Sequence, residues 1–262
     1  MTQPRAMVGL GLCLLVLTVL VAVLAGLASP DTLGGLTGLA GLSAIDPDGA
    51  GVARQTSGAA MADLSVLGAA AIGQAVLGLV VGLVLASRVG APLRGLVASM
   101  RVVSVFLLTV FGLVLLRAFD AESLGAVDPR VITAALLALA SWPMAAMAVC
   151  AAADLLASTA YFASARELGV NAVTRCIQHV LPGLWRPLLA AVAVGAIHMM
   201  GALFTLGFLG VATPGGAPGL GGLLRRGFDG FDPSAPAGLL IPAAAMTMIL
   251  LAFVLLREGL RE

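Results

Sequence analysis

Six apolar segments dominate the sequence, and each is long enough to cross a lipid bilayer as a helix. A helix rises about 1.5 Å per residue, so roughly 20 apolar residues match a hydrocarbon core of about 30 Å. The sequence therefore predicts an all-α integral membrane protein with six transmembrane helices. The expected spans are residues 7–28, 64–86, 96–116, 131–153, 187–211 and 238–256.

The composition agrees with a membrane protein and excludes several enzyme classes. Of the 262 residues, 60% are hydrophobic and only 10% are charged, whereas soluble domains average about 25% charged residues. All 14 residues counted as lysine or arginine are arginines. Without a lysine, this chain has neither a P-loop lysine nor a Schiff-base amine. Any ATP that drives it must therefore be hydrolysed by another subunit.

Charge and cysteine usage point to no nucleic acid and no bound metal. The net charge is +1, and no basic face of the kind that nucleic acids need is apparent. Cys13, Cys150 and Cys176 lie far apart and lack CxxC spacing, so we expect no metal site and no disulfide framework. The first apolar run has 22 residues, more than the roughly 7–15 of a signal peptide. We expect a retained helix there, with cleavage as the alternative.

The arginines predict how the chain is oriented in the membrane. With the N-terminus inside, nine arginines fall on the cytoplasmic side and five outside. Arg101 lies inside the third expected span, where we expect it to snorkel from near the end. Both termini are thus predicted to be cytoplasmic. Residues 29–63 are expected to form an external loop, and residues 212–237 an external loop or a re-entrant structure.

The segment 158–186, between the fourth and fifth spans, carries the most information. Residues 160–168 favour an amphipathic helix, and Gly169 can end it with a positive φ. Asn171 can cap a second helix, which Pro182 would then stop. The pattern predicts a cytoplasmic helix-turn-helix that projects from the membrane, a shape suited to docking in a groove of another protein.

Four motifs in this order resemble those of C-type permease subunits of bacterial dipeptide and oligopeptide ABC importers, over nearly the whole chain. The pattern Ala165-Arg166-x-Leu168-Gly169 followed by His179-Val180-Leu181-Pro182 is similar to their EAA loop. Ser141-Trp142-Pro143 stands where they carry Ser-Trp-Pro. Phe208-Leu209-Gly210 with the prolines after it resembles their external segment, and residues 251–261 resemble their C-terminal signature.

The resemblance implies which residues couple transport to ATP hydrolysis. Ala163 replaces the glutamate that names the EAA motif, so we hypothesise that Arg166, Glu167 and Arg175 supply the polar contacts instead. The expected ATPase-coupling residues are Ala163, Ala165, Arg166, Glu167, Leu168, Gly169, Arg175, His179, Leu181 and Pro182.

The resemblance also implies the fold and the partners. The fold is expected to be that of type I ABC importer permeases, without catalytic residues or cofactors of its own. A homologous B-type permease, one or two ATP-binding subunits carrying ATP and magnesium, and an extracytoplasmic substrate-binding protein would complete the importer. Peptides are the expected cargo, while nickel, haem and other solutes stay open.

Intramembrane polar residues offer further candidates. His198, Met199, Met200 and Trp142 are candidates for the translocation path, the alternative for His198 being a neutral histidine bonded to a neighbouring helix. Asp154, near the end of the fourth span, is expected to meet an arginine, with a proton relay as the alternative.

Two other classes of membrane protein fit the sequence less well than a permease does. A proton-coupled secondary transporter needs several intramembrane acids, and Asp154 is the single candidate. A rhomboid-like protease needs a serine in a Gly-x-Ser context near a histidine, and neither Ser104 nor Ser141 has that context. In the second span, Gly73, Gly78 and Gly82 would suit close approach of another helix.

Overall fold

The computed structural model describes residues 49–87, 89–118, 128–159, 174, 180–211, 219–231, 233 and 236–260. All regular elements in these ranges are helical, as the sequence predicts. They are α3 (Gly49–Ala86), η1 (Ala91–Leu93), α4 (Arg94–Met100), α5 (Val105–Ala118), α6 (Pro129–Ala157), α9 (Leu181–Phe208), α10 (Leu220–Asp229) and α11 (Ala237–Leu260).

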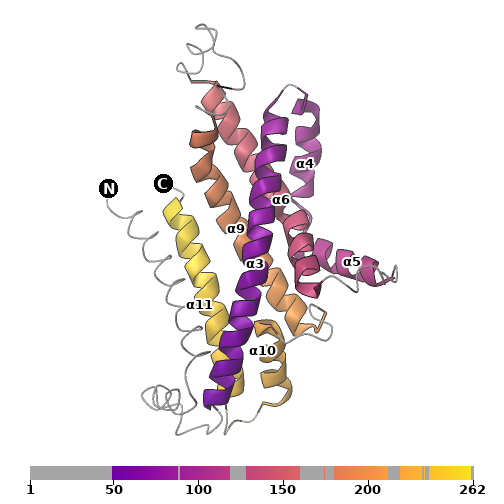
Figure 1. The fold of residues 1–262 in the computed structure, drawn as a ribbon, viewed down its shortest axis with the longest axis vertical. Helices are drawn as coiled ribbons and strands as arrows, with labels where there is room; N and C mark the ends of the chain where they lie inside the picture. The colour runs from indigo at the N-terminus through magenta and orange to yellow at the C-terminus, as the bar shows by residue number, and fades with distance from the viewer. Residues whose placement is uncertain are drawn as a thin grey trace.

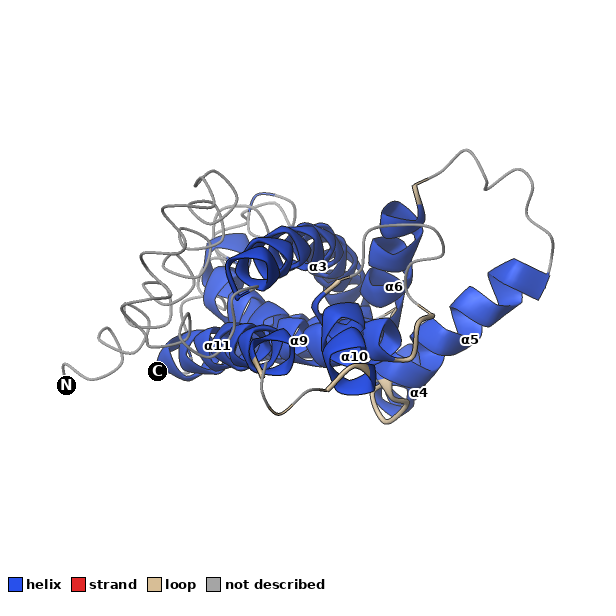
Figure 2. Cartoon of the chain, turned by 90° about the horizontal axis from the view of Figure 1, so that it is seen from below, coloured by secondary structure: helices blue, strands red, loops and turns tan. Residues whose placement is uncertain are grey.

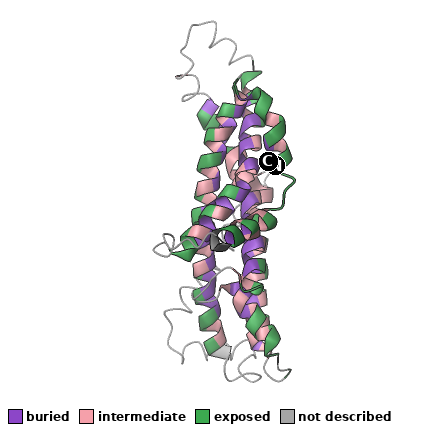
Figure 3. Cartoon of the chain, turned by 90° about the vertical axis from the view of Figure 1, so that its right-hand side faces the viewer, coloured by how far each residue is buried: buried purple, intermediate pink, exposed green. Residues whose placement is uncertain are grey.

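Four of the described helices, α3, α6, α9 and α11, are long and apolar enough to cross a membrane. They contain or closely overlap the expected spans 64–86, 131–153, 187–211 and 238–256. These helices form an elongated bundle (Figure 1). Their outward sides are largely exposed, and buried residues line the middle of the bundle (Figure 3). A bundle with apolar side chains on its exterior as well as in its core suits lipid surroundings.

The helices α3 and α6 form the closest contact, and small residues make it possible. A Cβ atom placed on Gly73 would lie 2.9 Å from the Cβ of Ala138, and one on Gly82 would lie 2.6 Å from the Cβ of Val149. Residue numbers rise together along both helices at these contacts, so α3 and α6 run in the same direction. The chain between them must therefore return to the side from which α3 began.

The other long helices complete the bundle in alternating directions. Near the start of α9, Val180 and Leu184 pack with Val149 and Ala153 of α6. The far end of α9 meets α10, where a T-shaped ring contact joins Phe208 and Phe228. α9 is thus antiparallel to α3 and α6, and α11 runs back beside α9 (Figure 1). Below, "the Arg94 end" is where α3 and α6 finish, and "the α10 end" is the opposite one.

The main core lies toward the α10 end, where α3, α6, α9, α10 and α11 meet. Its buried members include Leu67 of α3, Leu137 of α6, Met200 of α9, Leu220 of α10 and Ile249 of α11. Glycines let α10 lie close to its neighbours: a Cβ on Gly227 would lie 2.7 Å from the carbonyl carbon of Gly238. α10 is thereby held against the bundle inside the segment 212–237, which was expected to be a loop or re-entrant structure.

The segment 96–116 differs from the single span expected there. It is divided between α4 and α5, which meet at an angle of 86° across the break at residues 101–104. α5 projects away from the other helices (Figure 2). Arg101, expected to snorkel from a continuous helix, lies at this break and is exposed. Ending α4 before it keeps the guanidinium out of the middle of an apolar helix, where it would be costly.

The boundaries of α3 and α6 also follow from local chemistry. α3 begins 15 residues before the expected span and has 38 residues, a length of about 57 Å. The second half of the expected external loop 29–63 is therefore helical. α6 begins after Asp128, whose carboxylate accepts a hydrogen bond from the amide of Arg130 at 2.9 Å. Pro129 occupies the first helical position, where its missing amide hydrogen costs nothing.

Candidate functional site

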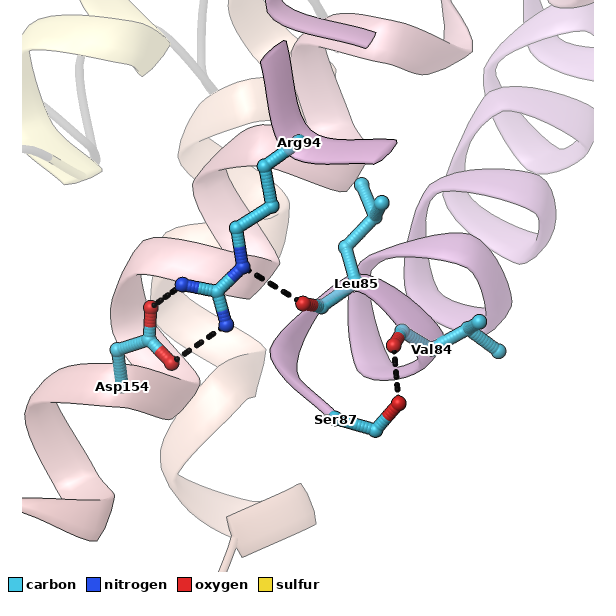
Figure 4. A network of polar contacts seen from close by, with 5 residues as sticks. All are labelled: Val84, Leu85, Ser87, Arg94 and Asp154. Atoms are coloured by element: carbon cyan, nitrogen blue, oxygen red, sulfur yellow. Dashed lines mark hydrogen bonds and ion pairs between the residues drawn. The ribbon is translucent and has the colours of Figure 1, made fainter. Parts of the chain in front are cut away.

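A charged junction at the Arg94 end ties three helices together (Figure 4). Arg94 donates from Nη1 and Nη2 to the carboxylate of Asp154 on α6, at 2.8 and 3.2 Å. Its Nε donates to the carbonyl oxygen of Leu85, in the last turn of α3, at 2.7 Å. Asp154 thus meets an arginine, as expected for a carboxylate at a helix end. A carboxylate held in a bidentate ion pair is poorly suited to relay protons.

The geometry of the turn after α3 brings Arg94 into place. The hydroxyl of Ser87 donates to the carbonyl of Val84 at 2.5 Å, and the amide of Gly90 donates to that hydroxyl at 3.3 Å. A Cβ on Gly90 would lie 2.6 Å from the Cα of Leu85, so a glycine lets the chain fold back closely. Arg94, the first residue of α4, is thereby placed within hydrogen-bond distance of the carbonyl of Leu85.

The expected coupling segment begins and ends at this same end of the bundle. Eight of the ten proposed coupling residues lie outside the described residues: Ala163, Ala165, Arg166, Glu167, Leu168, Gly169, Arg175 and His179. The other two, Leu181 and Pro182, are exposed in the first turn of α9. Beneath them, Val180 and Leu184 are buried against α6. This apolar contact and the Arg94–Asp154 pair anchor the two helices between which the segment runs.

A buried polar contact lies farther down, between α3, α6 and α9. The side chain of Gln74 is fully buried, and its Nε2 donates to the carbonyl oxygen of Ser141 at 3.4 Å. Its Oε1 accepts no hydrogen bond from the described residues. Ser141 Oγ donates to the carbonyl of Leu137 at 2.8 Å and lies 3.3 Å from the sulfur of Met199. Gly195 faces the Gln74 amide so closely that a Cβ there would overlap it.

The four candidates for a translocation path do not share one surface. His198 is exposed on α9, whereas Met199 and Met200 are fully buried in the core. Trp142 is half-buried and packs against the cluster that contains Leu85. Neighbouring residues on a helix lie about 100° apart, so His198 and Met199 face different sides.

Within the described residues, the hydrogen bond of His198 stays on its own helix and does not reach a neighbouring one. Its Nδ1 lies 2.8 Å from the carbonyl oxygen of Val194, one turn earlier on α9. His198 is the one of the four candidates that is exposed, whereas Trp142 is half-buried and both methionines are buried.

Asp63 makes a polar contact at the α10 end that sequence reasoning missed. It is buried on α3, and its Oδ2 accepts a hydrogen bond from the amide of Leu220 at 2.8 Å. Leu220 is the first residue of α10, so the carboxylate satisfies an otherwise free amide and meets the positive end of the helix dipole. Gly219 lies so close to Asp63 that a Cβ would overlap the carboxylate.

Sequence signals for these buried groups existed but were weak. Gln74 is the one amide side chain in the apolar run 64–86, and Asp63 immediately precedes that run. A polar side chain within a membrane helix usually faces the protein interior. The position of its partner, 67 residues away for Gln74 and 157 for Asp63, cannot be read from local spacing.

Two kinds of catalytic arrangement are absent from the described residues. They contain no group of three or more histidine, cysteine or acidic side chains that could hold a metal ion. The hydroxyl of Ser141 is directed to its own helix and to Met199, whereas His198 is exposed elsewhere on α9. A serine and histidine arranged for proteolysis are therefore absent from the described part of the chain. The geometry provides a helical bundle that is braced at both ends and carries an exposed histidine on α9.

Comparison with known proteins shows similarity to a transport family and to a dipeptide permease. Residues 74–261 match the family described as binding-protein-dependent transport system inner membrane component. A stretch of 102 residues is 30% identical to the dipeptide transport system permease protein DppC of Haemophilus influenzae. That stretch covers 39% of this chain and 34% of the relative, so the chain spans about a third of the length of the relative it matches.

Proposed function

The chain belongs to the family of binding-protein-dependent transport system inner membrane components, and from this premise we propose that it is one of two permease subunits of an ATP-driven peptide importer. The observation that carries the proposal is the extent of the family match, from Gln74 in α3 to Arg261. The matched region includes α6, α9, α10, α11 and the whole segment 158–186. As a permease of this family, the chain is a multi-pass membrane protein whose task is transport rather than catalysis.

The proposed topology has six spans, with both termini in the cytoplasm. The common direction of α3 and α6 supports a return crossing between them, for which the bent pair α4–α5 is the candidate. The excess of arginines on one side supports placing the Arg94 end in the cytoplasm. The α10 end would then face the outside, where a substrate-binding protein could deliver cargo.

Coupling to ATP hydrolysis is proposed to occur through residues 160–182 at the Arg94 end. These residues would form two short helices that dock on separate ATP-binding subunits, which carry ATP and magnesium. The ion pair between Arg94 and Asp154 supports this proposal, because it braces α4 against the helix that leads into the segment. The burial of Leu184 against α6 braces the helix that leaves it. A segment anchored on both sides can transmit a push to the bundle as a whole.

Peptides are proposed as the cargo, with a homologous B-type permease forming the other wall of the path. The similarity to a dipeptide transport system permease protein of Haemophilus influenzae supports this choice of cargo. The exposed His198 supports a path along α9, since a polar side chain in an apolar membrane helix is expected to meet polar surroundings.

Purification and uptake together test the proposal. The tagged chain, expressed with its neighbouring genes, should co-purify with a second permease and with ATP-binding subunits. Proteoliposomes containing that complex should take up labelled alanyl-alanine when the substrate-binding protein is outside and ATP is inside. Uptake that needs a proton gradient but neither ATP nor the ATP-binding subunits would overturn the importer assignment.

Charge reversal tests the coupling segment separately. The double variant Arg166→Glu with Arg175→Glu should lose the ATP-binding subunits on purification and lose uptake. A matched control reverses two arginines at the opposite end, Arg225→Glu with Arg226→Glu, and should retain the ATP-binding subunits. If the first variant kept them and its uptake equalled that of the wild type, residues 160–182 would not be the docking element.

A further inference from the structure

The exposed face of α9 presents hydrogen-bond acceptors. His198 Nδ1 lies 2.8 Å from the carbonyl oxygen of Val194. A carbonyl oxygen can only accept, so Nδ1 must carry the hydrogen of the neutral imidazole. In this neutral form the lone pair is on Nε2, which accepts no hydrogen bond from the described residues. His198 therefore offers its surroundings an acceptor.

Thr205 repeats this arrangement farther along the same face. Its hydroxyl donates to the carbonyl oxygen of Gly201 at 2.8 Å, so only its lone pairs remain for other groups. Thr205 is exposed, and it follows His198 by seven residues. That spacing returns to the same side of a helix about 10.5 Å along its axis.

No described residue fills the space between these two acceptors. A Cβ built on Gly201, which lies between them on α9, would meet no atom of the described residues within 4 Å. A larger side chain there would project into this space. We define His198, Gly201 and Thr205 as the acceptor stripe. An extended chain advances about 3.3–3.6 Å per residue, so roughly three peptide residues span the stripe.

The acceptor stripe lies near the middle of the bundle, at a level where a membrane helix would otherwise contact lipid hydrocarbon. Gly195, three residues before His198, contacts Gln74 in the middle of the apolar run 64–86 of α3, and Met199 contacts Ser141 near the middle of α6. His198 thus lies at the level of the middle of the bundle. An acceptor without a partner in hydrocarbon is costly, so this face calls for a partner that donates hydrogen bonds.

The chemistry of the stripe favours nitrogen donors over anions or metals. Residues 187–211 contain no arginine or lysine that could bind a carboxylate. Met199 and Met200 are buried, so they cannot join His198 around a metal ion. A peptide carries amide N–H groups and a terminal ammonium, which are the groups that acceptors bind.

Building on the proposed function, we propose that the acceptor stripe binds the N–H groups of the peptide during its passage. His198 Nε2 and Thr205 Oγ1 accept hydrogen bonds from the amide groups or the terminal ammonium. The stripe selects for donors and leaves the carboxylate end of the peptide to groups on the opposite wall. A second permease packed directly on the stripe is the competing occupant.

The test measures kcat/KM for uptake of alanyl-alanine or trialanine, whichever the wild-type complex transports faster, in proteoliposomes. His198→Leu removes the acceptor and should lower kcat/KM about tenfold. His198→Gln keeps an acceptor oxygen and should stay within about threefold of the wild type. His198→Arg supplies only donors and should fall to the level of His198→Leu or below. Thr205→Val should show a smaller loss than His198→Leu.

Thr247→Val is the matched control, because Thr247 is exposed on α11 and its hydroxyl also bonds one turn back, to Ala243 at 2.9 Å. It should behave as the wild type. The inference is overturned if His198→Arg matches His198→Gln, if Thr247→Val loses as much as Thr205→Val, or if His198→Leu no longer holds the second permease on purification. Failure of the proposed function looks different, since the wild-type complex itself would then take up neither peptide.

Discussion

Gly78 in the seam between α3 and α6 provides the sharpest test of how the bundle is held together. A Cβ at this position would overlap the Cβ of Ala145 and lie 3.2 Å from both the carbonyl carbon of Ala145 and the nitrogen of Ala146. Non-bonded carbon atoms prefer a separation of about 3.5–4.0 Å. The nearest atoms are backbone or Cβ atoms that cannot rotate away. Gly78→Ala therefore has to push the two helices apart at this level.

The expected cost of Gly78→Ala follows from overpacking, which typically destabilises by about 1–3 kcal/mol. For a chain of this size that corresponds to a fall in Tm of roughly 2–12 °C. Gly68 is the matched control: it lies on the same helix, is exposed, and a Cβ there would meet nothing within 4 Å. Gly68→Ala should leave Tm unchanged or raise it slightly, because alanine favours helix more than glycine does.

The assay is thermal unfolding of the purified complex in detergent, followed by loss of its size-exclusion peak. A second substitution sharpens it, because Ala145→Gly removes the methyl group that the new Cβ would meet. The double variant Gly78→Ala with Ala145→Gly should recover at least half of the loss, which is a direct coupling between the two positions. Equal Tm values for Gly78→Ala and Gly68→Ala, or no recovery of Tm in the double variant, would refute the close packing of Gly78 against Ala145.

Three further sets of substitutions probe the polar contacts. Arg94→Ala should lower Tm and uptake. The charge-swapped variant Arg94→Asp with Asp154→Arg should not restore them, because the carbonyl of Leu85 also needs a donor at position 94. Full recovery would show that the ion pair alone matters at this junction. Asp63→Ala should lower Tm by the equivalent of about 1–2 kcal/mol, because it removes the acceptor for the first amide of α10. Asp63→Asn keeps an acceptor and should lower Tm less. Equal falls in Tm would show that this hydrogen bond does not stabilise α10. Gln74→Leu should leave Tm unchanged or raise it, because it removes a buried acceptor that has no partner among the described residues. Gln74→Glu should lower Tm because it buries a charge. A large fall in Tm for Gln74→Leu would show that the amide is needed.

Hydropathy predicted the long helices well, because the tendency to leave water adds up along a segment and needs no knowledge of neighbours. It did not predict the break in 96–116. The mean hydropathy of that stretch favours a span, but the cost of one arginine is local and the chain avoids it by bending. Nor did it predict that α3 continues back to Gly49, since the less apolar residues there lie in a helix held by contacts with distant elements.

Some features of the candidate site were predictable from the sequence, and others depend on how the helices pack. That Asp154 would meet an arginine followed from its place near a helix end, but the choice of Arg94 depends on the turn that brings α4 back over α3. His198, Met199 and Met200 are consecutive, and the sequence treats them as one cluster. Helix rotation separates them by about 100° per residue, so packing places the two methionines in the core and the histidine outside. The eight proposed coupling residues that lie outside the described ranges remain predictions.

Composition and segment length were enough to establish that this chain is a helical membrane protein, because both are properties of the chain alone. That ATP is hydrolysed by a separate subunit stays a prediction from the absence of lysine. The folded structure was needed to show which face of each helix is buried, that Gly78 meets Ala145, and that His198 and Thr205 lie on an exposed face of α9. Partition into lipid depends on the sum over a segment, whereas contacts depend on the rotation and register of helices that are distant in sequence.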